Sequence, residues 1–215
     1  MGGGPSLFRY ASWCAYLNGT FAVVGFVLIA AFLAAGGPFH FLSDLAFFAS
    51  ALALVPIPWV LHQLGQTRLA TLSLVGTSVG LIGALGTVVL QAAALLQATT
   101  SEQQSAPLTI AFGAIGVWMI ISNYLARADR TLPGGVAWLG VIAGVGLVLA
   151  AVTLGFQGFR TSDPAALPHS DPLTGAGLAL SVIAHFASLT WAIWLGRALR
   201  DVGRLARPGA AAVRA

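Results

Sequence analysis

Six long apolar stretches run through the sequence, separated by short connections that are polar or rich in proline and glycine. They lie at residues 11–36, 43–63, 71–97, 107–125, 133–156 and 175–195. A helix of about 20 apolar residues crosses the hydrocarbon core of a bilayer. The pattern therefore predicts an all-α polytopic membrane protein, with six transmembrane helices in a single domain over residues 1–215 and a basic tail over residues 196–215.

The third stretch, residues 71–97, has two different faces when it is drawn as a helix. One face is small or polar: Ser73, Gly76, Gly80, Gly83, Thr87, Gln91 and Ala94. The other is bulky: Leu74, Ser78, Leu81, Leu85 and Val89. Because lipid is as apolar as leucine, membrane helices associate through small residues. We expect a central helix that packs through Gly76, Gly80 and Gly83 and turns its leucines outward.

Two prolines, Pro56 and Pro58, follow the middle of the second stretch. Each lacks a backbone N–H, so the helix is expected to bend there and to leave carbonyl groups for a neighbouring helix or water. At the start of this stretch, Ser43 is expected to be the N-cap, and Asp44 suits the positive end of the helix dipole.

The composition supports the membrane prediction and excludes several classes of protein. The chain is 58% hydrophobic and 7% charged, whereas soluble domains carry about 25% charged residues. It contains no lysine, which excludes retinal proteins and Schiff-base or pyridoxal enzymes. A single cysteine, Cys14, excludes an intramolecular disulfide.

The arginines predict the orientation. Nine of the ten fall at the chain ends or in alternate connections: Arg9, Arg68, Arg127, Arg130, Arg197, Arg200, Arg204, Arg207 and Arg214. The opposite connections hold only Arg160. By the positive-inside rule, both termini are predicted to be cytoplasmic. The net charge of +4 then reflects topology, and nucleic acid is not expected as a partner. All six tryptophans fall in the cytoplasmic half, which suggests an interfacial girdle.

A small set of uncharged polar residues lies within the predicted spans: Asn18, Gln91, Ser122, Asn123, Gln157, Ser181, His185 and Ser188. No carboxylate lies in a span interior, which disfavours coupling to ions or protons. His185 shares a helix face with Ser181 and Ser188, and we expect it to bridge Ser188 and another helix. These three residues, with Asn18 and Gln91, form the candidate site. The alternative is that they only stabilise helix packing.

The sequence disfavours two other functions, an intramembrane serine hydrolase and a haem protein. Residues 76–80 match GxSxG, but that motif requires a strand-to-helix turn, and Ser78 lies on the leucine face. His62 and His185 are predicted at different depths, which disfavours joint ligation of a haem. We therefore predict no catalytic residue, no metal ligand and no cofactor.

The segment from Arg127 into the fifth span, with Leu132-Pro133-Gly134-Gly135-Val136-Ala137-Trp138-Leu139-Gly140, resembles a family of six-span bacterial membrane proteins known only as a domain of unknown function. The likeness also includes Ser43-Asp44 and the glycine-rich third span. The resemblance implies six helices and a bacterial inner membrane, and it brings no catalytic residues.

The sequence thus predicts a non-enzymatic multi-pass protein of the bacterial cytoplasmic membrane. Its expected partners are the lipid bilayer and either a small apolar molecule, which it binds or passes, or another membrane protein. The alternative function is an intramembrane enzyme or a haem-containing redox protein that uses His185.

Overall fold

The computed structural model describes residues 5–64, 69–99, 101–160 and 172–205, and almost all of them are helical. The helices are α1 (Pro5–Ala35), α2 (Phe39–Leu54), α3 (Pro56–Leu64), α4 (Ala70–Leu95), α5 (Ser101–Ala128), α6 (Gly134–Arg160) and α7 (Pro172–Leu205). Within these residues, six helical segments are long and apolar enough to cross a membrane, with α2 and α3 together forming one of them. The all-α fold is confirmed, and so are six helical segments with the length and apolar character of membrane spans; these segments are called spans below.

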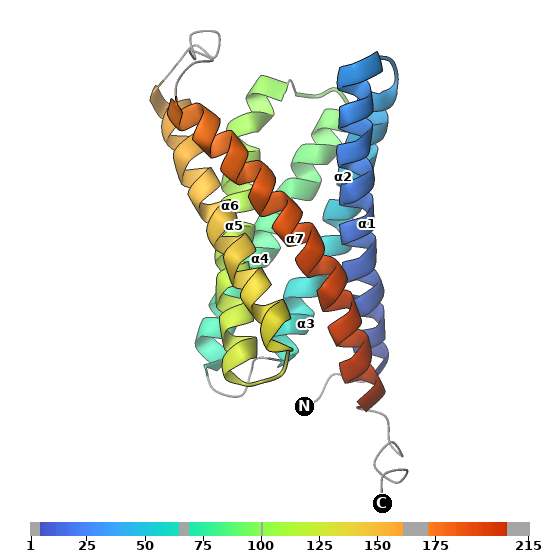
Figure 1. Ribbon diagram of the computed structural model, residues 1–215, viewed down its shortest axis with the longest axis vertical. Coiled ribbons are helices and arrows are strands. Elements are labelled where there is room, and N and C mark those ends of the chain that lie inside the picture. Colours follow the sequence, from blue (N-terminus) through green and yellow to red (C-terminus); the bar gives the residue numbers. More distant parts are fainter. Residues whose placement is uncertain (1–4, 65–68, 100, 161–171, 206–215) are drawn as a thin grey trace, which may run out of the picture.

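The six spans form a ring in which each packs on its neighbours in the sequence, and α7 closes the ring against α1. Figure 1 shows α7 crossing the bundle diagonally, from α6 at one end to α1 at the other. The start of α1 and the end of α7 lie at the same end of the bundle, called here the terminal end. The prediction that the third span is central is wrong, because α4 is one wall of the ring and packs mainly on α5, α2 and α3.

The second span breaks at Val55, directly before the first of the two prolines. The Val55 N–H donates to the carbonyl of Leu52 at 3.3 Å, a tighter turn than that of an α-helix. Beyond the break, α3 contacts α1, α4 and α5. Its side chains Ile57 and Val60 are buried. The break thus directs α3 into the ring.

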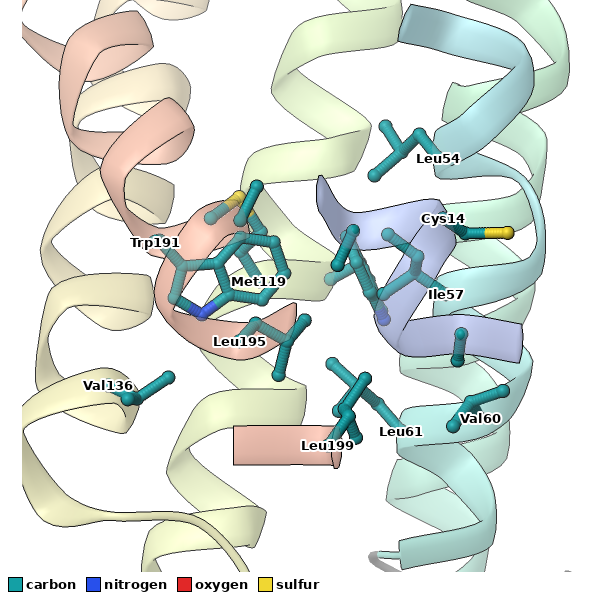
Figure 2. Close-up of a cluster of buried hydrophobic side chains, with 14 of the residues drawn as sticks. Cys14, Leu54, Ile57, Val60, Leu61, Met119, Val136, Trp191, Leu195 and Leu199 are labelled. Carbon is teal, nitrogen blue, oxygen red and sulfur yellow. The ribbon is translucent and has the colours of Figure 1, made fainter. Parts of the chain in front are cut away.

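A cluster of buried apolar side chains fills the ring at the terminal end. Figure 2 shows Leu61 of α3 beside Leu199 of α7, with Trp191 and Leu195 of α7 on one side and Ile57 and Val60 of α3 on the other. All six belong to one buried cluster. Because this end is packed, any internal space lies toward the middle of the bundle or the opposite end.

The faces of α4 lie as its sequence pattern predicts. Ser73, Gly76, Gly80, Gly83 and Thr87 are buried. A methyl group added at Gly83 would lie 2.8 Å from the carbonyl oxygen of Ala111 on α5, so the two backbones are in close contact. On the other face, Leu74 and Val89 are 52% and 66% exposed. A helix that buries glycine and exposes leucine suits surroundings of lipid.

The tryptophan girdle is only partly correct. Trp13, Trp59, Trp138 and Trp194 lie on the outer surface, and the Arg127 guanidinium stacks over the Trp138 ring at 4.4 Å. Trp118 and Trp191, however, are each 1% exposed and meet edge to face inside the bundle. The position of a tryptophan in the sequence indicates its depth along a span, but it does not indicate whether the side chain faces outward or into the bundle.

The helix ends also differ from the predictions. Ser43 is not an N-cap, since α2 begins at Phe39, and its hydroxyl donates to the carbonyl of His40 at 2.6 Å. Helix α5 begins at Ser101, so most of the predicted polar connection before residue 107 is helical. The predicted tail over 196–215 continues α7 to Leu205, and its remainder lies outside the described residues. Arg68, Arg207 and Arg214 also lie outside them.

Candidate functional site

A cavity of about 280 Å³ lies inside the ring, next to the buried cluster. All six spans contribute to its wall. Leu54, Met119 and Trp191 belong to the cavity wall and also to the buried cluster, so the cluster forms the floor of the cavity. Most of the remaining wall is apolar or aromatic: Ala22, Phe26, Phe47, Ala51, Leu108, Phe112, Ile115, Leu147, Val182 and Leu189.

The five residues of the predicted polar site all line this cavity. Asn18 comes from α1, Gln91 from α4, and Ser181, His185 and Ser188 from α7. The other three polar candidates do not line it. Ser122 donates to the carbonyl of Trp118 on its own helix, and Asn123 is buried below the floor. The side chain of Gln157 lies outside the described part of the structure.

Asn18 is fixed by a reciprocal pair of hydrogen bonds between α1 and α2. Its Nδ2 donates to the backbone carbonyl of Ser50 at 3.0 Å, and the Ser50 hydroxyl donates to the backbone carbonyl of Asn18 at 3.1 Å. The Ser50 carbonyl can accept a hydrogen bond from the nitrogen of the Asn18 side chain but not from its oxygen. The orientation of the Asn18 carboxamide is therefore determined. The Asn18 Oδ1 atom accepts no hydrogen bond from the described residues.

His185 is oriented by its own helix. Its Nδ1 lies 2.7 Å from the backbone carbonyl oxygen of Ser181, so Nδ1 carries a hydrogen and donates it. In the neutral ring, Nε2 is then an acceptor with a free lone pair. The ring packs edge to face against Phe112 of α5, with 4.7 Å between the centroids, and more loosely against Phe26 of α1.

The predicted interhelical bridge through His185 is therefore wrong. Ser188 donates its hydroxyl to the backbone carbonyl of His185 at 2.8 Å and not to the ring. The Ser181 hydroxyl lies 3.5 Å from Nδ1, which is already engaged as a donor. In the described part of the chain, the His185 ring meets other helices through its aromatic contacts with Phe112 and Phe26. Neither serine is arranged to lose its proton to His185, as a nucleophile would.

The two histidines considered for haem ligation are not brought together. His62 does not line the cavity; its Nδ1 lies 2.8 Å from the Ser73 hydroxyl, which ties α3 to α4. Ser78 is on the exposed face of α4. His40 pairs with Asp44 at 3.1 Å near the start of α2. Among the described residues, no three metal-ligating side chains form a group.

A hydrogen-bonded unit below the floor was missed by the sequence analysis. The Trp191 indole N–H donates to Asn123 Oδ1 at 2.9 Å, and Asn123 Nδ2 donates to the carbonyl of Met119 at 2.8 Å. Asn123 packs directly on Gly140 of α6. The unit joins α5, α6 and α7. No local signal identifies it, because Asn123 and Trp191 are 68 residues apart.

Ser50 was also missed, although a signal for it exists. The buried residues of α2 include Ser43, Ala46 and Ser50, small side chains at the three- and four-residue spacing of one helix face. This is the pattern that identified the packing face of α4. Applied to the second span, it would have placed Ser50 inside the bundle.

Comparison with protein-family models, with curated proteins and with solved structures found no significant match to this chain. The resemblance to a six-span bacterial family stays a prediction.

Proposed function

We propose that the protein is a multi-pass integral membrane protein that binds a small, neutral, mostly apolar molecule in the cavity within its helical ring. The observation that carries the proposal is the wall of the cavity. The described residues of the wall are apolar apart from a few uncharged amides and hydroxyls and one histidine, and none of them is Asp, Glu, Lys or Arg. Pockets for small molecules have this character, with an apolar lining and a few polar groups that set orientation.

The chemistry of the wall favours a neutral occupant. An ion moved from water into an apolar cavity requires a compensating charge, and the wall supplies none. An apolar molecule gains about 25 cal/mol for each Å² of its surface removed from water. No described group is arranged for nucleophilic catalysis, so we propose binding, with or without passage across the membrane, and not a reaction.

Co-purification tests this function. The protein is purified in nanodiscs, and the small molecules extracted from it are identified by mass spectrometry. Ala22 lines the cavity, so Ala22→Phe fills part of it, whereas Ala30→Phe adds the same side chain to the exposed face of the same helix. We expect a molecule enriched at close to one equivalent in the wild type and in Ala30→Phe, and depleted at least about tenfold in Ala22→Phe. Equal recovery from all three proteins would exclude the cavity as the binding site.

We further propose that the terminal end of the bundle faces the cytoplasm of a bacterium. The described arginines Arg9, Arg127, Arg130, Arg197, Arg200 and Arg204 lie at that end, which supports the orientation by the positive-inside rule. Arg160 ends α6 at the opposite side. Four outward-facing tryptophans in the same half suit an interfacial position.

Cysteine labelling in intact cells tests the orientation. In a Cys14→Ala background, Ala98→Cys should react with a membrane-impermeant maleimide, because Ala98 is exposed at the end opposite the termini. Ala128→Cys, exposed at the terminal end, should react only after the cells are lysed. The reverse pattern would invert the topology, and labelling of both positions in intact cells would exclude a membrane barrier between them.

The alternative is a redox protein with His185 as a haem ligand. One feature favours it: Nδ1–H bonded to a backbone carbonyl leaves Nε2 free, the arrangement common in metal-bound histidines. The visible absorption spectrum of the purified protein decides this alternative. A haem band that disappears in His185→Gln would favour it, and a colourless protein would exclude it.

A further inference from the structure

Five of the hydrogen-bond donors that line the cavity are engaged within the protein. The hydroxyls of Ser188, Thr87 and Ser50 donate to backbone carbonyls at 2.8, 2.9 and 3.1 Å. The Asn18 amide donates to the Ser50 carbonyl, and His185 Nδ1–H donates to the Ser181 carbonyl. These donors cannot serve a ligand without breaking an existing hydrogen bond in an apolar environment, which is unfavourable because the carbonyl that loses its donor is left unpaired.

Acceptors remain open on two sides of the cavity. His185 Nε2 on α7 and Asn18 Oδ1 on α1 have no hydrogen-bond partner within the described part of the chain, and both residues line the cavity. The Gln91 carboxamide on α4 also lines it and can accept or donate. His185 Nε2 is the most restricted of these groups. The carbonyl of Ser181 holds the hydrogen on Nδ1, so Nε2 can only accept.

Aromatic rings pack against the imidazole ring that carries this acceptor. Phe112 and Phe26 both meet the His185 ring edge to face, and Phe26 in turn meets Phe47 at 5.3 Å between centroids. All three phenylalanines line the cavity. Aromatic walls of this kind favour a flat or cyclic apolar body, since ring pairs gain more than the burial of their area alone provides.

From these contacts we infer that the ligand is a neutral cyclic or aromatic alcohol, one that donates its O–H to Nε2 of His185. A ketone or ether of the same shape lacks the hydrogen that Nε2 requires, and an apolar ring without the hydroxyl leaves the acceptor unpaired. This inference rests on the proposed function and adds the chemical class of the ligand. The geometry makes His185 the residue that selects an alcohol over its ether.

Paired probes test the inference. Binding of 2-naphthol and of 2-methoxynaphthalene to the protein in nanodiscs is measured by calorimetry against empty nanodiscs. The wild type should prefer the naphthol by about tenfold, the effect of one hydrogen bond to a buried acceptor. His185→Phe keeps an aromatic ring and removes the acceptor, so it should bind both probes with similar affinity. His185→Gln supplies a carbonyl acceptor and should keep part of the preference.

Nitrogen NMR of the wild-type protein measures the protonation of the His185 ring directly, so this second test does not require a variant to fold. In protein labelled with ¹⁵N-histidine, His185 should show a protonated Nδ1 and an unprotonated Nε2, and 2-naphthol should shift the Nε2 resonance. Equal binding of the two probes to the wild type, or a proton on Nε2, would overturn the inference while leaving ligand binding intact. If neither probe binds, and nothing co-purifies with the wild type, the proposed function fails, and this inference fails with it.

Discussion

Gly80→Ala is expected to destabilise the bundle by about 1–3 kcal/mol, although it adds a single methyl group. The Cβ of that alanine would overlap the ring of Trp118 on α5. The ring cannot move away easily, because it is 1% exposed and meets Trp191 edge to face at 5.8 Å. Gly80→Leu should prevent normal assembly of α4 on α5. Thermal unfolding in detergent measures both effects.

Gly86→Ala is the matched control on the same helix. A methyl group there would meet only the Cβ of Ala111, at the ordinary contact distance of 3.8 Å. Since alanine favours a helix over glycine by up to about 1 kcal/mol, this variant should equal or exceed the wild type in stability. Equal destabilisation by both variants would mean that the loss comes from the helix itself and not from the contact between α4 and α5.

Asn123→Ala is expected to have the second large effect. It leaves the indole N–H of Trp191 without its acceptor inside the bundle, which costs about 1–3 kcal/mol, and it opens a void against Gly140. Trp191→Phe removes the donor instead. Because the double variant has no unpaired indole, its loss of unfolding free energy should be smaller than the sum of the two single losses.

Ser122→Ala is the control for this unit. The Ser122 hydroxyl bonds only to a carbonyl of its own helix, so its removal should change the unfolding free energy by less than about 0.5 kcal/mol. Additive losses in the Asn123 and Trp191 variants would contradict a direct bond between the two side chains. The floor of the cavity would then be held by packing alone.

The features that the sequence could predict are those encoded in the periodicity of one helix. Glycines at three- and four-residue spacing on α4 reveal a face that packs on protein, and the structure buries that face. Rare polar residues within apolar spans are costly unless they face the interior, which is why Asn18, Gln91 and His185 meet at one cavity.

The features that the sequence could not predict depend on pairs of helices. A helical wheel shows which face of a helix packs on protein, but it does not show which helix that face contacts. The sequence therefore predicts α4 at the centre of the bundle, whereas α4 forms part of the wall of the ring. The girdle prediction is wrong at Trp118 and Trp191, which are both buried. An indole can be buried when a residue distant in the sequence packs against its ring or accepts its N–H. The partner of Trp191 is Asn123, and nothing local to either residue indicates the other.

An experimental density map of the protein, purified from its native membrane without added ligand, tests the central claim most directly. We expect non-protein density the size of a small cyclic molecule in the cavity between Phe26, Gln91 and His185, with a polar atom near Nε2 of His185. A cavity collapsed by inward-turned side chains, or one filled with ordered water alone, would contradict the account.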